Sequence, residues 1–148
     1  MRYPTLLVLG TLASCSAAET RGTGAPDGWR TEAPRDEIRP AFRYNGTFVI
    51  EHDRREGLQG WWARTYDVQG GRSYRFRAVR RVKGVDLPRR SASARLVWGD
   101  AQGRPVLLDE PWTRDVLKNF APTAEAEHPL DRETDAAGWT EVMVGSGL

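Results

Sequence analysis

Alternation between apolar and polar side chains over residues 60–82, GWWARTYDVQGGRSYRFRAVRRV, constrains the fold more than any other feature of the chain. Every second residue from Trp62 to Val68 falls on one face of an extended backbone, and the same holds from Tyr74 to Val82. A period of two is typical of strands with one face on a core and the other in water. The Gln-Gly-Gly between the two runs supplies the positive-φ positions of a tight turn. We therefore expect two β-strands paired as a hairpin.

Four further segments have strand-like composition and lie between turn signals such as Asn45-Gly46: 47–51, 92–98, 105–108 and 139–144. No stretch has a helical period long enough for an α/β architecture. At 148 residues the chain is long enough for one domain. The pattern predicts an all-β fold, an antiparallel jelly-roll β-sandwich.

The remaining segments have weaker patterns. Residues 28–42 contain two prolines and predict an extended lead-in. Residues 83–90 and 125–138 lack apolar periodicity and predict a basic and an acidic loop. Residues 112–120 carry apolar side chains four apart and could form one or two helical turns.

The first fourteen residues predict a bacterial lipoprotein signal peptide. A single positive charge, Arg2, precedes an apolar run that is too short to span a bilayer. The run ends in Leu-Ala-Ser before Cys15, which matches a lipobox and makes Cys15 the expected lipidation site. We divide the chain into a signal peptide (1–14), a flexible tether (15–27) and a β-sandwich module (28–148). The expected location is the cell envelope, anchored to the membrane by lipid; with Cys15 incidental, the chain would be secreted or periplasmic.

Charge and motifs exclude several function classes. The net charge is only +2, and the skew toward arginine, 20 of the 22 basic residues, is what a GC-rich genome produces, so no nucleic-acid partner is expected. A single cysteine excludes an internal disulfide and a cysteine-built metal site. The sequence has no phosphate loop, HExxH, GxSxG or paired CxxC. We expect no catalytic residues, so the chain is predicted not to be an enzyme.

The candidate ligand-binding residues are three tryptophans and one arginine: Trp61, Trp62, Trp98 and Arg64. Trp61 and Trp62 are adjacent, so on a strand they point to opposite faces. One is expected in the core; the other is either covered by a neighbouring segment or exposed for binding, and the sequence leaves open which is which. An exposed indole with an arginine beside it suits a sugar ring, so a glycan is the expected ligand.

No cofactor is predicted, and no set of side chains has the spacing of a metal site. His52 and His128 lie far apart and are interpreted as solvated loop residues. Three acids near the C-terminus, Asp131, Glu133 and Asp135, could together hold a structural Ca²⁺, although they do not follow the spacing of an EF-hand loop.

Four segments resemble a module known from planctomycete-type carbon–nitrogen hydrolase proteins: GWRTEAPRDEIRPAF, REGLQGWWARTYDVQGGRSYRFRAVRRV, PRRSASARLVW and EHPLDRETDAAGWTEV. The resemblance covers residues 28–142. It implies a galactose-binding-like, carbohydrate-binding-like jelly roll that precedes a hydrolase domain. The catalytic residues of that family belong to the hydrolase domain and have no counterpart here. The resembling proteins continue with further strands where this sequence reads MVGSGL, so the sandwich is expected to lack its last strands.

Two kinds of function follow from these observations. The first is a non-catalytic, lipid-anchored envelope module that binds a glycan. The second is an accessory module that docks against a hydrolase domain, or a truncated fragment of such a protein.

Overall fold

The computed structural model describes residues 5–9, 24–107 and 123–144, and among them it is almost entirely β. All strand pairs are antiparallel, which confirms the expected all-β class. Helix is limited there to a 3₁₀ turn, η1 (Asp36–Ile38), and one turn of α-helix, α1 (Pro88–Ser91). Neither is long and apolar enough to cross a membrane, and no other helix occurs in these ranges.

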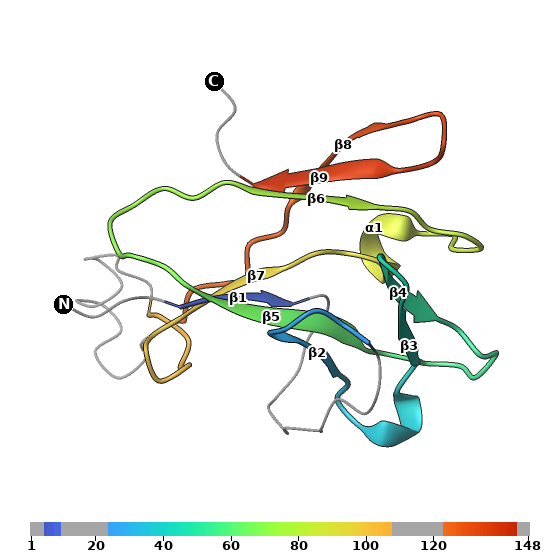
Figure 1. Ribbon diagram of the computed structural model, residues 1–148, viewed down its shortest axis with the longest axis horizontal. Coiled ribbons are helices and arrows are strands. Elements are labelled where there is room, and N and C mark those ends of the chain that lie inside the picture. The colour runs from blue at the N-terminus through green and yellow to red at the C-terminus, as the bar shows by residue number, and fades with distance from the viewer. Residues whose placement is uncertain (1–4, 10–23, 108–122, 145–148) are drawn as a thin grey trace, which may run out of the picture.

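The largest sheet has four strands in the order β2-β5-β1-β7 (Figure 1). Their bounds are β2 (Trp29–Glu32), β5 (Trp61–Asp67), β1 (Thr5–Leu9) and β7 (Leu96–Gly99). The interior strand β1 therefore comes from the segment that the sequence analysis expects to be part of a signal peptide. The side chains of β1 are not described.

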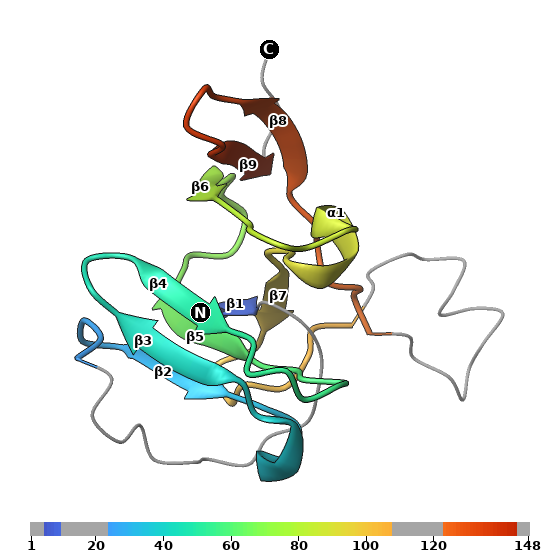
Figure 2. The same ribbon diagram turned by 90° about the vertical axis from the view of Figure 1, so that its right-hand side faces the viewer.

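A hairpin of β3 (Ala41–Tyr44) and β4 (Phe48–Glu51) forms a second sheet. The predicted Asn45-Gly46 turn joins the two strands, and Gly46 takes the positive φ of 86° that this turn requires. Figure 2 shows the hairpin lying over β2 and β5. Side chains explain this position, because Phe42 and Phe48 of the hairpin contact the ring of Trp62 on β5.

A third sheet has the order β6-β9-β8, with β6 (Phe76–Arg80), β9 (Thr140–Val144) and β8 (Leu130–Thr134). Both views show it on one side of the four-stranded sheet (Figures 1 and 2). Burial alternates along β6 as expected, with Phe76, Ala78 and Arg80 half-buried and Arg77 and Val79 exposed. The three sheets thus form layers, whereas the jelly-roll strand order stays a prediction.

The predicted hairpin across residues 60–82 is wrong. Both strands exist, as β5 and β6, and Gly71 takes a positive φ of 76° in the turn between them. However, β5 pairs with β2 and β1, and β6 pairs with β9, so the two strands belong to different sheets. The buried Val68 and a bond from the backbone N–H of Gln69 to the hydroxyl of Tyr74 (2.7 Å) fix the crossing between the layers.

Other predicted elements are confirmed or corrected one by one. Strands at 47–51 and 139–144 are confirmed as β4 and β9, and the strand at 92–98 is confirmed only for its second half, β7. The acidic loop predicted at 125–138 is wrong, because it contains β8, and the lead-in at 28–42 contains β2 and the start of β3. The basic loop at 83–90 runs into α1. Residues 105–107 make only isolated bridges, and the helical turns predicted at 112–120 lie outside the described residues.

Candidate binding surface

Both adjacent tryptophans are buried. Trp61 is 1% exposed and Trp62 is 7% exposed. Of the two alternatives left open by the sequence, the structure therefore has the one in which a neighbouring segment covers the second ring. On one face of β5, the indole N–H of Trp61 donates to Oε2 of Glu32 on the adjacent strand at 2.9 Å. Neither indole presents a broad face to a ligand.

The cover over Trp62 is the β3–β4 hairpin. The indole N–H of Trp62 donates to the backbone carbonyl of Val49 at 3.2 Å. The ring centroids of Phe42 and Phe48 lie 5.6 and 5.2 Å from that of Trp62, and the Trp29 ring packs against Phe48 at 4.3 Å with the ring planes tilted by 39°. This aromatic cluster holds the hairpin on the sheet, so Trp62 is a structural residue.

Beyond the edge of this cluster, Arg64 and Tyr66 continue along the same face of β5. The guanidinium carbon of Arg64 lies 4.8 Å from the centroid of the Tyr66 ring, and Tyr66 is 38% exposed. Trp29 stands opposite Arg64 in the β2–β5 register and is itself half-buried. The guanidinium of Arg64 makes no hydrogen bond or ion pair with any part of the chain that the structure describes. Within the described residues, its N–H donors are therefore unoccupied.

Glycine at position 28 makes room for this arrangement. A Cβ built on Gly28 would lie 3.3 Å from Nε of Arg64, and the φ of Gly28 is +81°. A side chain there would press on the guanidinium and strain the backbone. We call Trp29, Arg64 and Tyr66 the Arg64 surface. Of these three residues, only Arg64 is a binding candidate from the sequence. Tyr66 could have been predicted as well, because the alternation places it on the same strand face. Trp29 could not, because β2 is not among the predicted strands.

Trp98, the fourth predicted ligand-binding residue, lies apart from this surface. It shares a sheet face with Tyr66 by register, but β1 separates the two strands. Its indole N–H donates to Oε1 of Glu127 at 2.6 Å, and the ring is half-buried. The structure therefore joins Trp98 to the segment at Glu127 and not to Arg64.

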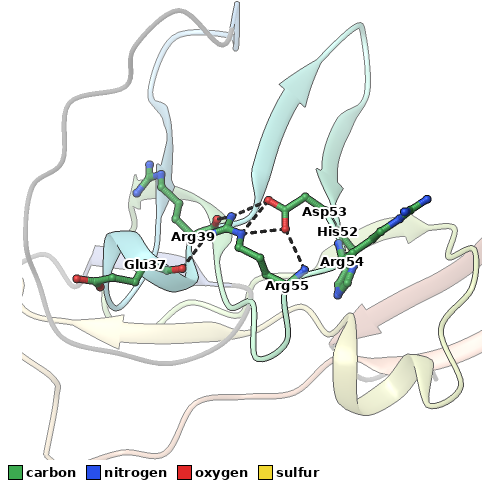
Figure 3. Close-up of polar contacts among 6 residues, drawn as sticks. All are labelled: Glu37, Arg39, His52, Asp53, Arg54 and Arg55. Carbon is green, nitrogen blue, oxygen red and sulfur yellow. Dashed lines mark hydrogen bonds and ion pairs between the residues drawn. The ribbon is translucent and has the colours of Figure 1, made fainter.

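The loop that carries His52 is held by arginine contacts (Figure 3). Nη1 and Nη2 of Arg55 donate to the backbone carbonyls of Glu37 and Arg39 at 2.7 and 2.8 Å, and Nη2 also contacts Asp53 at 2.7 Å. The hydrogen bond from Arg55 holds the pKa of Asp53 below its ordinary value. Nδ1 of His52 accepts the backbone N–H of Arg54, whose φ is +73°. These contacts close a surface loop and leave His52 exposed.

The three acids considered for Ca²⁺ have separate surroundings. Asp131 contacts Nη2 of Arg80 at 2.5 Å and Nε of Arg89 at 3.5 Å. Asp135 accepts the backbone N–H groups of Ala137 and Trp139, which closes the β8–β9 turn. Within residues 5–9, 24–107 and 123–144, no group of three or more His, Cys, Asp or Glu side chains is close enough to hold a metal ion. Cys15 lies outside these ranges.

No protein-family model matches this chain, and no significant match is found among curated proteins or among solved structures. The similarity to a hydrolase-associated module therefore stays a prediction from the sequence.

Proposed function

We propose that this chain is a non-catalytic envelope module, anchored by lipid at Cys15, that binds a glycan at the Arg64 surface. The observation that carries the proposal is a half-exposed arginine with free donors, stacked on a partly exposed tyrosine and beside a tryptophan. Sugars are recognised by aromatic faces together with donors that bond their hydroxyl or carboxylate oxygens. The jelly-roll, galactose-binding-like character suggested by the sequence agrees with such a role.

The proposal assigns the binding role to other aromatics than the tryptophan pair. Trp61 and Trp62 support the surface from within, because burial leaves no stacking face on either ring. Trp29 and Tyr66 supply the accessible rings, and Arg64 supplies charge and donors. An acidic sugar suits the guanidinium best, since a carboxylate can take two of its N–H groups at once.

A titration of the full chain with a panel of neutral and acidic polysaccharides tests this function. Arg64→Ala should weaken binding of the preferred glycan by about 10-fold or more, the value of one charge-assisted hydrogen bond. Arg75→Ala is the matched control, because Arg75 is exposed and directly precedes β6, which belongs to a different sheet from β5. Equal binding by both variants, or no binding by the wild type to any polysaccharide, would contradict the proposal.

A second candidate function, docking of a partner domain, rests on the outer face of the three-stranded sheet. By register, Val79, Leu130 and Met143 lie on this face, and Val79 and Leu130 are 57% and 58% exposed. The ion pair of Arg77 and Glu141 lies on the same face, and such a mixture of exposed apolar and charged groups suits a protein interface. Val79→Lys would abolish capture of a hydrolase-domain partner and leave glycan binding unchanged, so the two functions are separable.

A further inference from the structure

The interior position of β1 has an unusual consequence for a chain that is processed at Cys15. β1 pairs with β5 from Thr5 opposite Asp67 to Leu9 opposite Ala63, and with β7 from Thr5 opposite Gly99 to Val8 opposite Leu96. β5 and β7 do not pair with each other (Figure 1). Among the described residues, only the segment Thr5–Leu9 joins them within the sheet.

Both flanking strands have other anchors. β5 is paired with β2 on its far edge and lies under the β3–β4 hairpin through Trp62. β7 is held by reciprocal backbone hydrogen bonds between Leu96 and Glu127, at 2.9 and 2.8 Å, and by the indole of Trp98. The two strands therefore keep their supports when β1 is absent.

Removal of residues 1–14 would leave a gap one strand wide. Neighbouring strands lie about 4.8 Å apart, so β5 and β7 stand roughly 10 Å from each other, too far for direct hydrogen bonds. The backbone groups that β1 satisfies would lose their partners, and unpaired backbone groups in a core are strongly disfavoured. A strand of the right chemistry would restore every one of these bonds.

We propose that the processed chain binds an extended, predominantly apolar segment of a partner protein in the position of β1, antiparallel to both β5 and β7. The inference rests on the processing at Cys15 put forward under the proposed function. We call this position the β1 slot.

The slot itself specifies the chemistry of its occupant. At one end of the slot, Leu9 stands opposite Ala63, which is fully buried, and Val8 stands between Leu96, which is 2% exposed, and Arg64. A charge at the position of Leu9 would be desolvated beside Ala63 without a partner, whereas the position of Val8 has the Arg64 side chain as a neighbour. The other end lies beside Tyr66 and Asp67, which are exposed, and tolerates a polar residue such as Thr5. The sequence that now fills the slot, TLLVL, has this composition.

A cleavable full-length chain tests the slot. Cys15→Ser keeps the leader attached, and a protease site inserted between residues 18 and 19 allows it to be cut after folding. The probe is a fluorescent peptide of residues 4–10, PTLLVLG. We expect the cut chain to bind this peptide, whereas the uncut chain excludes it because the tethered strand competes at high effective concentration. The matched control peptide carries Leu7→Pro, which removes one backbone donor and should bind at least about 10-fold more weakly.

Amide hydrogen exchange provides a second readout that does not depend on the label. Amides of residues 63–67 and 96–99 should exchange faster once the cut strand is removed, and slow again when the peptide is added. Retained protection without any strand, together with no peptide binding, would show that β5 and β7 close on each other and would overturn the proposal. Self-association of the cut chain without peptide would assign the slot to a second copy and overturn the proposed partner.

The failure of the slot and the failure of the lipid anchor are distinguishable. The mass of the chain isolated from membranes reports whether residues 1–14 are removed. An intact leader in cells would refute processing, and with it the partner strand, even if the peptide binds the cut chain. A processed chain that does not bind the peptide would refute the slot alone.

Discussion

At the scale of single residues, burial separates the structural aromatics from the accessible ones. Trp62 is 7% exposed beneath the β3–β4 hairpin, while Tyr66, four positions along the same face of β5, is 38% exposed. Aromatic residues on one strand face thus have different roles according to what covers them. A sequence of alternating aromatics does not specify that cover, because the β3–β4 hairpin that supplies it lies earlier in the chain.

Truncation of Trp61 should strongly destabilise the protein. Trp61→Ala is expected to lower the free energy of unfolding by about 3–5 kcal/mol, through loss of buried apolar contacts and the bond to Glu32. Val79→Ala, at a side chain that is 57% exposed, is the control and should change it by no more than about 0.5 kcal/mol. Urea unfolding curves measure both; a loss below about 1 kcal/mol for Trp61→Ala would show that the indole is not in the core.

Acid should release the loop held by Arg55. The pKa of Asp53 is lowered in the folded chain by its hydrogen bond with Arg55, so the ionised pair favours the folded loop. This stabilisation is complete above the pKa of Asp53 in the unfolded chain, about 4. It is lost as the pH falls through the lower pKa of Asp53 in the folded chain.

The nitrogen resonance of the Arg55 side chain, followed by NMR between neutral pH and about pH 2, measures this release. We expect one transition below the ordinary pKa of an aspartate, and no transition in Asp53→Asn. A midpoint above the ordinary value would contradict the geometry of the pair.

At the scale of elements, the sequence predicts strands better than it predicts their partners. The period-two pattern locates β5 and β6, because alternation reflects burial of one face whatever lies beside the strand. It does not identify the neighbours, and the Gln-Gly-Gly turn reverses the chain equally well within a sheet and between layers. β8 was missed because its sequence, LDRET, is charged and mostly exposed at the edge of a sheet.

The hairpin over β5 depends on a glycine. A Cβ at Gly60 would lie 2.7 Å from Cζ of Phe42 and 2.7 Å from Cδ of Pro40. We therefore expect Gly60→Ala to destabilise the chain by about 1–3 kcal/mol through overpacking between the hairpin and β5. Ala41→Ser, on the exposed side of β3, serves as the control.

Thermal unfolding measures the effect of Gly60→Ala, and the near-ultraviolet circular dichroism of the aromatic cluster reports whether the hairpin shifts. A variant as stable as the wild type, with an unchanged aromatic spectrum, would show that the hairpin does not pack this closely.

At the scale of the whole molecule, the N-terminal segment has two interpretations, a cleaved leader and a strand of the sheet. Its composition predicts a leader, yet in the fold its residues form the interior strand β1. Apolar composition suits both roles, because a signal peptide and a buried strand each require uncharged side chains. The pairing of the strands adds what composition lacks, namely that in the part of the chain that the structure describes this strand connects β5 to β7.

The most direct test of the account is the thermal midpoint of the full chain with and without polysaccharides. A ligand that binds only the folded state raises the midpoint by mass action. We predict a cooperative melt whose midpoint rises with at least one acidic polysaccharide, and we predict that Arg64→Ala, but not Arg75→Ala, abolishes the rise. A cooperative melt that no polysaccharide shifts would contradict glycan binding as the function of the Arg64 surface.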